Sequence, residues 1–405
     1  IASQNNNISK NFIFLCLRIS SKEGMTALIH PPSIFDDSSG GEARSKLYFR
    51  LRKLFHFRNE LLLFDIIHTV FFVLAIYGSP KKSPQFQAIF KLLHPKTIEG
   101  CFSKKDKDSV PPKPKNEKGA WNLSGHPKRL ITVDDTFLKQ SASATGMSID
   151  NFLETRILQP FTDTSILLTN KLFKGNKLLS DVFPNILISR GLSESGAQKS
   201  GLIERKSAFS SLENIVILTG SNLHICNPLY KSAKEICTHP LHYNFIQSSL
   251  DEYLIPRTVY QQKRNNEEIY IQDKLCDSFR ICLPAQIDPG SERCLQPSII
   301  PPTWSHIHGI LSFKTENIFS DIQLCGILSS IIFDYFIKSS GKSNFLKNML
   351  LALPIPNKID NYLSQELIAR VVALNAMNSS YSIFLDLLYK ELINRNVIKT
   401  EDYEN

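Results

Sequence analysis

Residues 253–356 form the stretch on which the prediction of the fold depends. In chain order they contain Ile255-Pro256-Arg257-Thr258-Val259-Tyr260, Phe279-Arg280, Ser291-Glu292-Arg293-Cys294-Leu295, Ile300-Pro301-Pro302-Thr303-Trp304-Ser305-His306-Ile307, Gly341-Lys342-Ser343-Asn344 and Leu353-Pro354-Ile355-Pro356. Arginines recur here among aromatic and proline-fixed segments. That pattern is typical of a surface on which guanidinium groups meet phosphates or guanine edges while rings pack beneath them. We therefore predict a nucleic-acid-reading surface in this part of the chain.

An apolar run at residues 324–337 has the length of one helix and leads into the turn Lys338-Ser339-Ser340-Gly341-Lys342. Such a turn can present Lys338 and Lys342 to a backbone phosphate. Each basic residue also has a structural alternative. A single arginine in a globular domain commonly forms an ion pair, and Lys338 and Lys342 equally suit the end of a helix.

The composition of the chain suits a folded protein with a polyanionic partner. Its 405 residues are enough for about two to four domains, and a hydrophobic content of 42% supports real cores, which excludes a disordered tail. The net charge of +9 and the isoelectric point near 9.0 fit nucleic acid as a partner.

The cysteines and histidines do not predict a metal site. Eight cysteines are present without a Cys-x-x-Cys pair, so neither a zinc ribbon nor a thioredoxin-like motif is indicated. Cys237 lies near His239 and His242 in the sequence, but no second cysteine stands at the usual ligand spacing. We expect free thiols in a cytoplasmic protein and no metal.

The sequence predicts no membrane segment. The opening residues have neither the basic start nor the apolar core of a signal peptide, and we expect the chain to begin inside a longer protein. Residues 61–77 are apolar but short, and Asp65 and His68 interrupt them. We expect a buried helix and strand there.

Residues 11–80 fit the latter half of a parallel α/β sheet. We expect helices at 12–19 and 43–53, and strands at 25–30, 55–57 and 69–76, because the strand segments are short apolar runs rich in β-branched and aromatic residues. Residues 104–118 are rich in lysine and proline and predict a basic loop. Helical patterns occur at 367–374 and 383–393.

These motifs carry a family resemblance. Residues 253–356 resemble the target-recognition region of large Type II DNA adenine-N6 methyltransferases, the fused restriction-modification kind. Further motifs of the chain are similar to the end of the Rossmann-type methylase domain in that family: Leu17-Arg18-Ile19-Ser20-Ser21-Lys22-Glu23-Gly24, Phe35-Asp36-Asp37, Arg58-Asn59-Glu60-Leu61 and Phe64-Asp65-Ile66-Ile67-His68. The similarity runs from about residue 15 to residue 356.

The resemblance implies an α/β fold followed by a mixed α+β fold. Residues 1–80 would be the C-terminal end of a Rossmann-like methyltransferase sheet. Residues 81–180 would be a connector with the basic loop, residues 181–356 the target-recognition domain, and residues 357–405 a helical C-terminal segment.

The resemblance also implies a function, which is target recognition within a restriction-modification-like defence system. Double-stranded DNA is the expected partner, as is a missing N-terminal methyltransferase half that binds S-adenosylmethionine. The expected DNA contacts are Arg257, Lys263, Arg264, Arg280, Arg293, His306, Lys338 and Lys342. No residue of this chain is expected to be catalytic, and the chain alone is expected to be inactive.

Two features of the sequence agree with an incomplete catalytic apparatus. S-adenosylmethionine binding in this fold uses a glycine-rich turn, and no Gly-x-Gly occurs in the chain. The nearest counterpart of a catalytic Asn-Pro-Pro-Tyr loop is Cys226-Asn227-Pro228-Leu229-Tyr230, in which Leu229 replaces the second proline. A nuclease motif with Pro-Asp followed by Glu-x-Lys does not stand out either.

The chain departs from the family pattern at Val259, Leu283 and Cys294, where members commonly carry polar residues. A lost polar partner in a DNA interface costs about 1–3 kcal/mol per base contact. The alternative hypothesis is therefore a non-catalytic DNA-binding specificity module or subunit.

Overall fold

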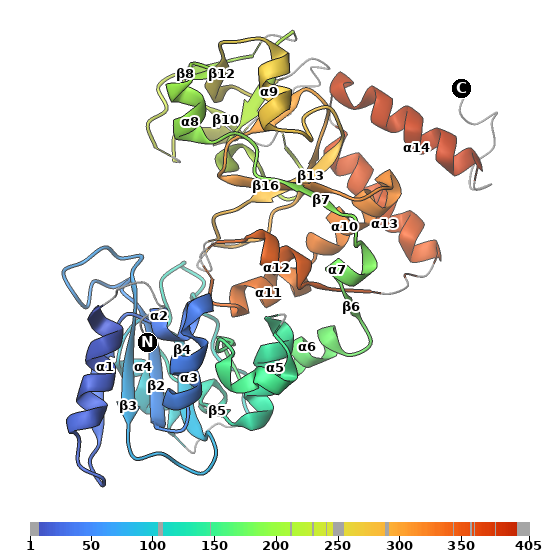
Figure 1. Ribbon diagram of the computed structural model, residues 1–405. Coiled ribbons are helices and arrows are strands. Elements are labelled where there is room, and N and C mark those ends of the chain that lie inside the picture. The colour runs from blue at the N-terminus through green and yellow to red at the C-terminus, as the bar shows by residue number, and fades with distance from the viewer. Residues whose placement is uncertain are drawn as a thin grey trace. The chain divides into compact units, whose positions relative to one another are not determined.

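The computed structural model describes residues 8–103, 108–145, 147–210, 213–228, 231–239, 241–245, 255–287, 291–342, 344–356, 359, 361–376 and 378–394. Several residues of the predicted motifs lie outside this set, namely Leu229, Tyr230, Ser343 and residues 104–107 of the basic loop. The chain divides into two compact units (Figure 1). Unit one comprises Ile1–Asn176 with Ser339–Gly341, and unit two comprises Lys177–Lys338 with Lys342–Asn405. The domain boundaries expected after residues 80, 180 and 356 stay predictions.

Unit one contains a mixed five-stranded sheet. Its strands stand in the order β1 (Thr26–His30), β3 (Phe71–Tyr77), β2 (Leu51–Arg58), β4 (Phe86–Leu92) and β5 (Ile131–Val133). Only β2 and β4 pair in parallel, and the other neighbours are antiparallel. The expected parallel sheet is therefore corrected to a mixed one. Strands β4 and β5 come from the segment that was expected to be a connector.

Short helices surround this sheet. They are α1 (Ile8–Ile19), α2 (Ser33–Asp36), α3 (Gly41–Leu47), α4 (Lys96–Cys101), α5 (Asp135–Ala144) and α6 (Thr164–Phe173), with the 3₁₀ helices η1 (Ser38–Gly40), η2 (Pro127–Arg129) and η3 (Ile149–Glu154). The buried Arg44 joins three of them, because its guanidinium donates to the carbonyl oxygens of Ile34 at 3.1 Å, Asp37 at 2.6 Å and Glu154 at 2.9 Å.

The segment between β2 and β3 is a loop. Asn59 organises it, with its Nδ2 donating to the carbonyl oxygens of Phe64 at 2.9 Å and Ile66 at 2.8 Å. Leu62 and Ile67 are exposed in this loop. The expectation of a buried helix before the strand is therefore wrong, because a side-chain amide replaces the helical hydrogen bonds.

Unit two is built on two four-stranded sheets among its described residues. One has the order β15 (Trp304–His306), β9 (Val216–Leu218), β12 (Thr258–Gln262) and β8 (Ile203–Ala208). The other has the order β14 (Ser298–Ile300), β13 (Arg280–Pro284), β16 (Ile310–Lys314) and β7 (Leu187–Ser189). Two smaller antiparallel pairs are β10 (Lys231–Ala233) with β11 (Tyr243–Phe245), and β6 (Lys177–Leu178) with β17 (Pro354–Ile355).

The helices of this unit are α7 (Leu179–Val182), α8 (Glu194–Lys199), α9 (Asn266–Gln272), α10 (Ile318–Leu328), α11 (Ile331–Ser339), α12 (Lys347–Leu351), α13 (Asn361–Asn375) and α14 (Ser382–Asn394), with the 3₁₀ helices η4 (Gly220–Asn222) and η5 (Ser379–Tyr381). The two helical patterns predicted near the C-terminus are confirmed by α13 and α14.

The apolar run expected to form one helix is two helices, α10 and α11, bent by 66°. Ser329 stands at the break, and its hydroxyl donates to the carbonyl oxygen of Cys325 at 2.7 Å. Among the described residues, no single helix has the length and apolar character to cross a bilayer, and only this bent pair passes that test jointly. Helix α10 packs in the core through Ile322, Leu324 and Leu328.

Candidate nucleic-acid interface

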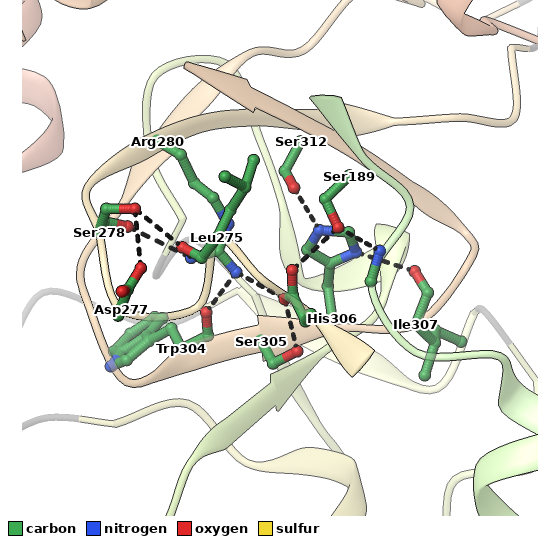
Figure 2. A network of polar contacts seen from close by, with 12 residues as sticks. Ser189, Leu275, Asp277, Ser278, Arg280, Trp304, Ser305, His306, Ile307 and Ser312 are labelled. Atoms are coloured by element: carbon green, nitrogen blue, oxygen red, sulfur yellow. Dashed lines mark hydrogen bonds and ion pairs between the residues drawn. The ribbon is translucent and has the colours of Figure 1, made fainter. Parts of the chain in front are cut away.

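Arg280, one of the expected DNA contacts, lies in the interior of unit two (Figure 2). Its Nη2 is 2.9 Å from the Asp273 carboxylate and donates to the carbonyl oxygen of Trp304 at 2.7 Å. Its Nη1 donates to the carbonyl oxygen of Leu275 at 2.6 Å. Both partners of the ion pair are fully buried. The assignment of Arg280 as a DNA contact is therefore corrected, because the guanidinium is fully buried and both of its terminal nitrogens donate to groups inside the protein.

The partners of Arg280 explain why this charge is buried. Asp273 follows α9 and also accepts hydrogen bonds from the hydroxyls of Ser189 at 2.9 Å and Ser305 at 2.8 Å. Burial alone would raise the pKa of Asp273, but Arg280 and these hydroxyls hold that pKa below its ordinary value. Ser189 and Arg280 belong to one sheet and Ser305 to the other, so the ionised pair ties the two sheets together.

His306 is the second expected contact that the structure places inside the protein. Its Nδ1 lies 3.1 Å from the carbonyl oxygen of Ile307 and its Nε2 lies 2.7 Å from the Ser312 hydroxyl, as Figure 2 shows. Burial and the nearby Arg280 charge lower the pKa of His306 to about 4, so the ring is neutral at neutral pH. A buried neutral ring cannot meet a phosphate, and this assignment is corrected as well.

The backbone packs tightly against His306. Gly191 has φ of +62°, and a Cβ at this position would lie 2.1 Å from the carbonyl oxygen of His306. The N–H of Leu192 donates to that oxygen at 2.8 Å. Glycine is therefore required where the chain turns around the histidine.

Arg293 and Lys338 form a second group, centred on Asp334 of α11. The Asp334 carboxylate is 3.6 Å from Arg293 Nε and 3.1 Å from Lys338 Nζ. It also accepts the backbone N–H groups of Cys294 and Leu295, each at 2.8 Å. Both cations are mostly covered, with about a fifth of each side chain exposed. Arg293 and Lys338 thus join residues 292–295 to α11, since Lys338 also donates to the carbonyl oxygen of Glu292 at 2.6 Å, and their assignment as DNA contacts stays a prediction.

Arg257, Lys263 and Arg264 are at the surface, at the two ends of β12. Lys263 Nζ lies 3.5 Å from a Glu204 carboxylate oxygen, and Arg264 Nη1 lies 3.0 Å from Glu268. Figure 1 shows β8 and β12 at one end of unit two and α11 at the other. The structure therefore does not gather the expected contacts on one surface. Lys342 is half-buried in the turn after Gly341.

Arg257 belongs to a cluster of cations and exposed rings that the motifs did not indicate. We call this cluster the ribbon patch, and it consists of Arg205, Phe209, Lys231, Lys234, Phe245 and Arg257. Arg257 lies over the Phe209 ring at 4.6 Å, and Lys231 lies over the Phe245 ring at 5.5 Å. The two rings are 57% and 64% exposed. Cations of this kind remain available to an anionic partner while they orient the rings.

Hydrogen bonds fix the antiparallel ribbon of β10 and β11 to β8 and β12. The Ala233 N–H donates to the carbonyl oxygen of Arg257 at 3.0 Å, and the Arg257 N–H donates to the Ser232 hydroxyl at 2.9 Å. On the other side, the Ser207 hydroxyl donates to the carbonyl oxygen of Lys234 at 2.5 Å. Strands from three separate parts of the sequence thus present their side chains together.

The positions at which the chain departs from the family pattern are all buried. Val259 packs in the core beside Tyr260, and Leu283 and Cys294 are also covered. The apolar side chains therefore match their surroundings, and none of the three lies where it can touch DNA.

The described residues also include Cys237, His239 and Asn227, which the sequence motifs singled out. Among the described residues, no group of histidine, cysteine and acidic side chains is arranged to hold a metal ion. The Cys237 thiol instead donates to the carbonyl oxygen of His239 at 3.7 Å. The backbone of Asn227, from the segment that looks like a catalytic loop, accepts a hydrogen bond from the His224 N–H at 3.1 Å.

No protein-family model matches the chain, and no curated protein matches it either. Among solved structures, a type IIG restriction endonuclease, BpuSI, matches at 13% sequence identity with a TM-score of 0.32. The match covers 90% of this chain, which spans 44% of the length of that structure. A TM-score of this size does not establish a shared fold, and no residue role follows from it.

Proposed function

We propose that this chain supplies DNA target recognition to a site-specific adenine-N6 methyltransferase of a restriction-modification system. The motifs at residues 253–356 support the family assignment, and the ribbon patch supports the contact with DNA. In this proposal the patch binds duplex DNA, and methyl transfer from S-adenosylmethionine belongs to a catalytic portion outside these 405 residues.

The ribbon patch is the observation that carries the proposal. A two-stranded β-ribbon fits the major groove of B-form DNA, and several DNA-binding proteins read sequence in this way. Arg205, Lys231, Lys234 and Arg257 would neutralise phosphates on either side of the groove. Asn244 is exposed on β11, and an asparagine amide in the groove can pair with the edge of an adenine.

The acidic residues near the ribbon patch are either engaged with other groups or outnumbered by its cations, so the patch favours a polyanionic partner. Glu204, on β8, pairs with Lys263. Glu194 accepts a hydrogen bond from the Tyr260 hydroxyl. Glu235 is exposed in the ribbon itself and is outnumbered by the cations around it. The local potential is therefore positive, which also raises the rate of association with DNA.

A salt titration of DNA binding tests the proposal. Lys231→Gln and Arg257→Gln should each weaken the binding of a random-sequence duplex, measured by fluorescence anisotropy. Each should also reduce the slope of log K against log salt concentration by about 0.9, the value for one phosphate contact. Arg370→Gln removes an equal charge from an exposed site on α13, so it serves as the matched control and should leave the slope unchanged. Equal slopes for all four proteins would contradict the proposal.

A non-catalytic specificity subunit is the second candidate function, and the ribbon patch supports it equally. The two differ in where the catalytic portion resides. Methyl transfer to plasmid DNA by the complete reading frame that contains this sequence separates them. Activity in one polypeptide supports the fused enzyme, whereas activity that appears only after a second polypeptide is added supports the subunit.

A further inference from the structure

The tip of the β10–β11 ribbon carries two protruding apolar side chains. Ile236 is 78% exposed and Leu241 is 79% exposed. A single exposed leucine or isoleucine is ordinary on a protein surface. Here two of them stand at the end of one ribbon, next to the cations of the ribbon patch.

Hydrogen bonds join several described residues of the tip. The Lys234 N–H donates to the carbonyl oxygen of His242 at 2.9 Å, which extends the ladder beyond β10 and β11. The His242 N–H donates to the carbonyl oxygen of His239 at 2.8 Å, and the Leu241 N–H donates to His239 Nδ1 at 3.1 Å. The polar groups at the tip therefore bond within the tip, and the apolar side chains of Ile236 and Leu241 are left outside.

The base of the ribbon is anchored as well. The Tyr243 and Thr219 hydroxyls lie 2.8 Å apart, and Asn222 Nδ2 donates to the carbonyl oxygen of Lys231 at 3.2 Å. A ribbon with hydrogen bonds at its base and near its tip can keep its conformation when it contacts a partner. Rigidity of this kind is what an inserting element needs.

We propose that Ile236 and Leu241 form an apolar wedge that enters between stacked base pairs of the duplex bound by the ribbon patch. This inference rests on the proposed DNA-binding function and names how the ribbon meets the bases. Apolar wedges of this kind unstack one base step and kink the duplex, which lets more of the protein reach the backbone.

Charge complementarity selects DNA as the occupant. Lys234 comes two residues before Ile236 in the sequence, and Arg205 lies near enough to influence the pKa of Cys237, the residue after Ile236. Cations beside a wedge are placed to bind the phosphates that flank an opened step. Glu235 is the acidic residue next to the wedge, and it is exposed to solvent.

The test uses a duplex selected from a random pool by the wild-type chain. Permanganate reactivity of thymines reports unstacked bases, and energy transfer between dyes at the two ends reports bending. The wild-type chain should raise thymine reactivity at one step and bring the ends closer. The double variant Ile236→Ser with Leu241→Ser should lose both signals and bind about tenfold more weakly, because the wedge contacts are lost.

Two control variants keep the result interpretable. Ile271→Ser on α9 removes a comparably exposed isoleucine, 72% exposed, and should behave as the wild type. Leu241→Phe keeps an apolar wedge and should keep the thymine signal. The wedge is overturned if the double variant binds with the same salt slope and still distorts the duplex. If the wild-type chain selects no duplex, the proposed function itself fails.

Discussion

Replacing Arg280 by methionine should destabilise unit two severely. The substitution keeps much of the side-chain volume and leaves Asp273 as a buried carboxylate without its cation. It also removes the Arg280 donor from the carbonyl oxygen of Trp304, whereas the carbonyl oxygen of Leu275 still accepts from Ser278. Removing one member of a buried, hydrogen-bonded pair costs about 3–5 kcal/mol. A loss of that size is a large part of the free energy of unfolding of an ordinary domain, which is about 5–15 kcal/mol.

Trp304 gives a direct assay for this loss. The chain has two tryptophans, and Trp304 is buried in unit two whereas Trp121 belongs to unit one. In a Trp121→Phe background, fluorescence during urea unfolding therefore reports unit two alone. Arg264→Met is the matched control, because its ion pair with Glu268 is about half exposed and should contribute only about 0.2–1 kcal/mol. Equal midpoints for Arg280→Met and Arg264→Met would refute a structural role for Arg280.

The same fluorescence assay checks the remaining predictions. His306 has its pKa lowered to about 4, from an ordinary value of 6.5, so the unfolded state binds more protons between these values. The contribution of His306 to stability is on the order of 3 kcal/mol; it is complete above pH 6.5 and is lost as pH falls toward 4. The difference in unfolding free energy between wild type and His306→Gln should therefore shrink as pH falls through that window. Burial raises the pKa of Asp321 to about 7, from 3.8, so its protonated form stabilises the fold below pH 3.8 and that contribution is lost as pH rises toward 7. The difference in unfolding free energy between wild type and Asp321→Asn should therefore fall as pH rises, which is opposite to the His306 case. A difference that rises with pH, as for His306, would contradict the assignment. Gly191→Ala should lower the midpoint strongly, because its Cβ would meet the His306 carbonyl oxygen, whereas Gly309→Ala has open space around its Cβ and should not.

Some local elements of unit one could be predicted from the sequence because they depend on local patterns, but the helix expected at 43–53 ends at Leu47, and residues 51–53 begin β2. The apolar run before His30 and the aromatic segment around Phe55 form strands where they were expected. The direction of pairing could not be predicted in this way. It depends on which edge each strand reaches, and the pairing of β4 with β5 involves a strand more than 40 residues further on.

The burial of Arg280 was beyond sequence reasoning for a related reason. Its partner Asp273 is close in the chain, but Ser189 and Ser305, which help to keep that carboxylate charged, come from distant strands. An arginine among rings and prolines has the same local pattern whether it lies on a surface or ties two sheets together. Only the fold distinguishes the two.

The ribbon patch was missed because its parts are far apart in the sequence and weak individually. Phe209 follows β8, Lys231 begins β10 and Arg257 precedes β12. No segment is especially basic by itself. The available signal was Arg257 alone, which the resemblance indicated and which is the member that the patch shares with the expected contacts.

Hydrogen exchange of the chain with and without a duplex tests most directly whether the ribbon patch is the DNA-binding surface. Backbone amides in residues 203–209, 231–239 and 241–245 should exchange more slowly when a duplex selected from a random pool is bound. The segment around Asp334 of α11 should exchange at the same rate in both states. Protection confined to residues 291–342, or no protection anywhere, would contradict the assignment of DNA recognition to the ribbon.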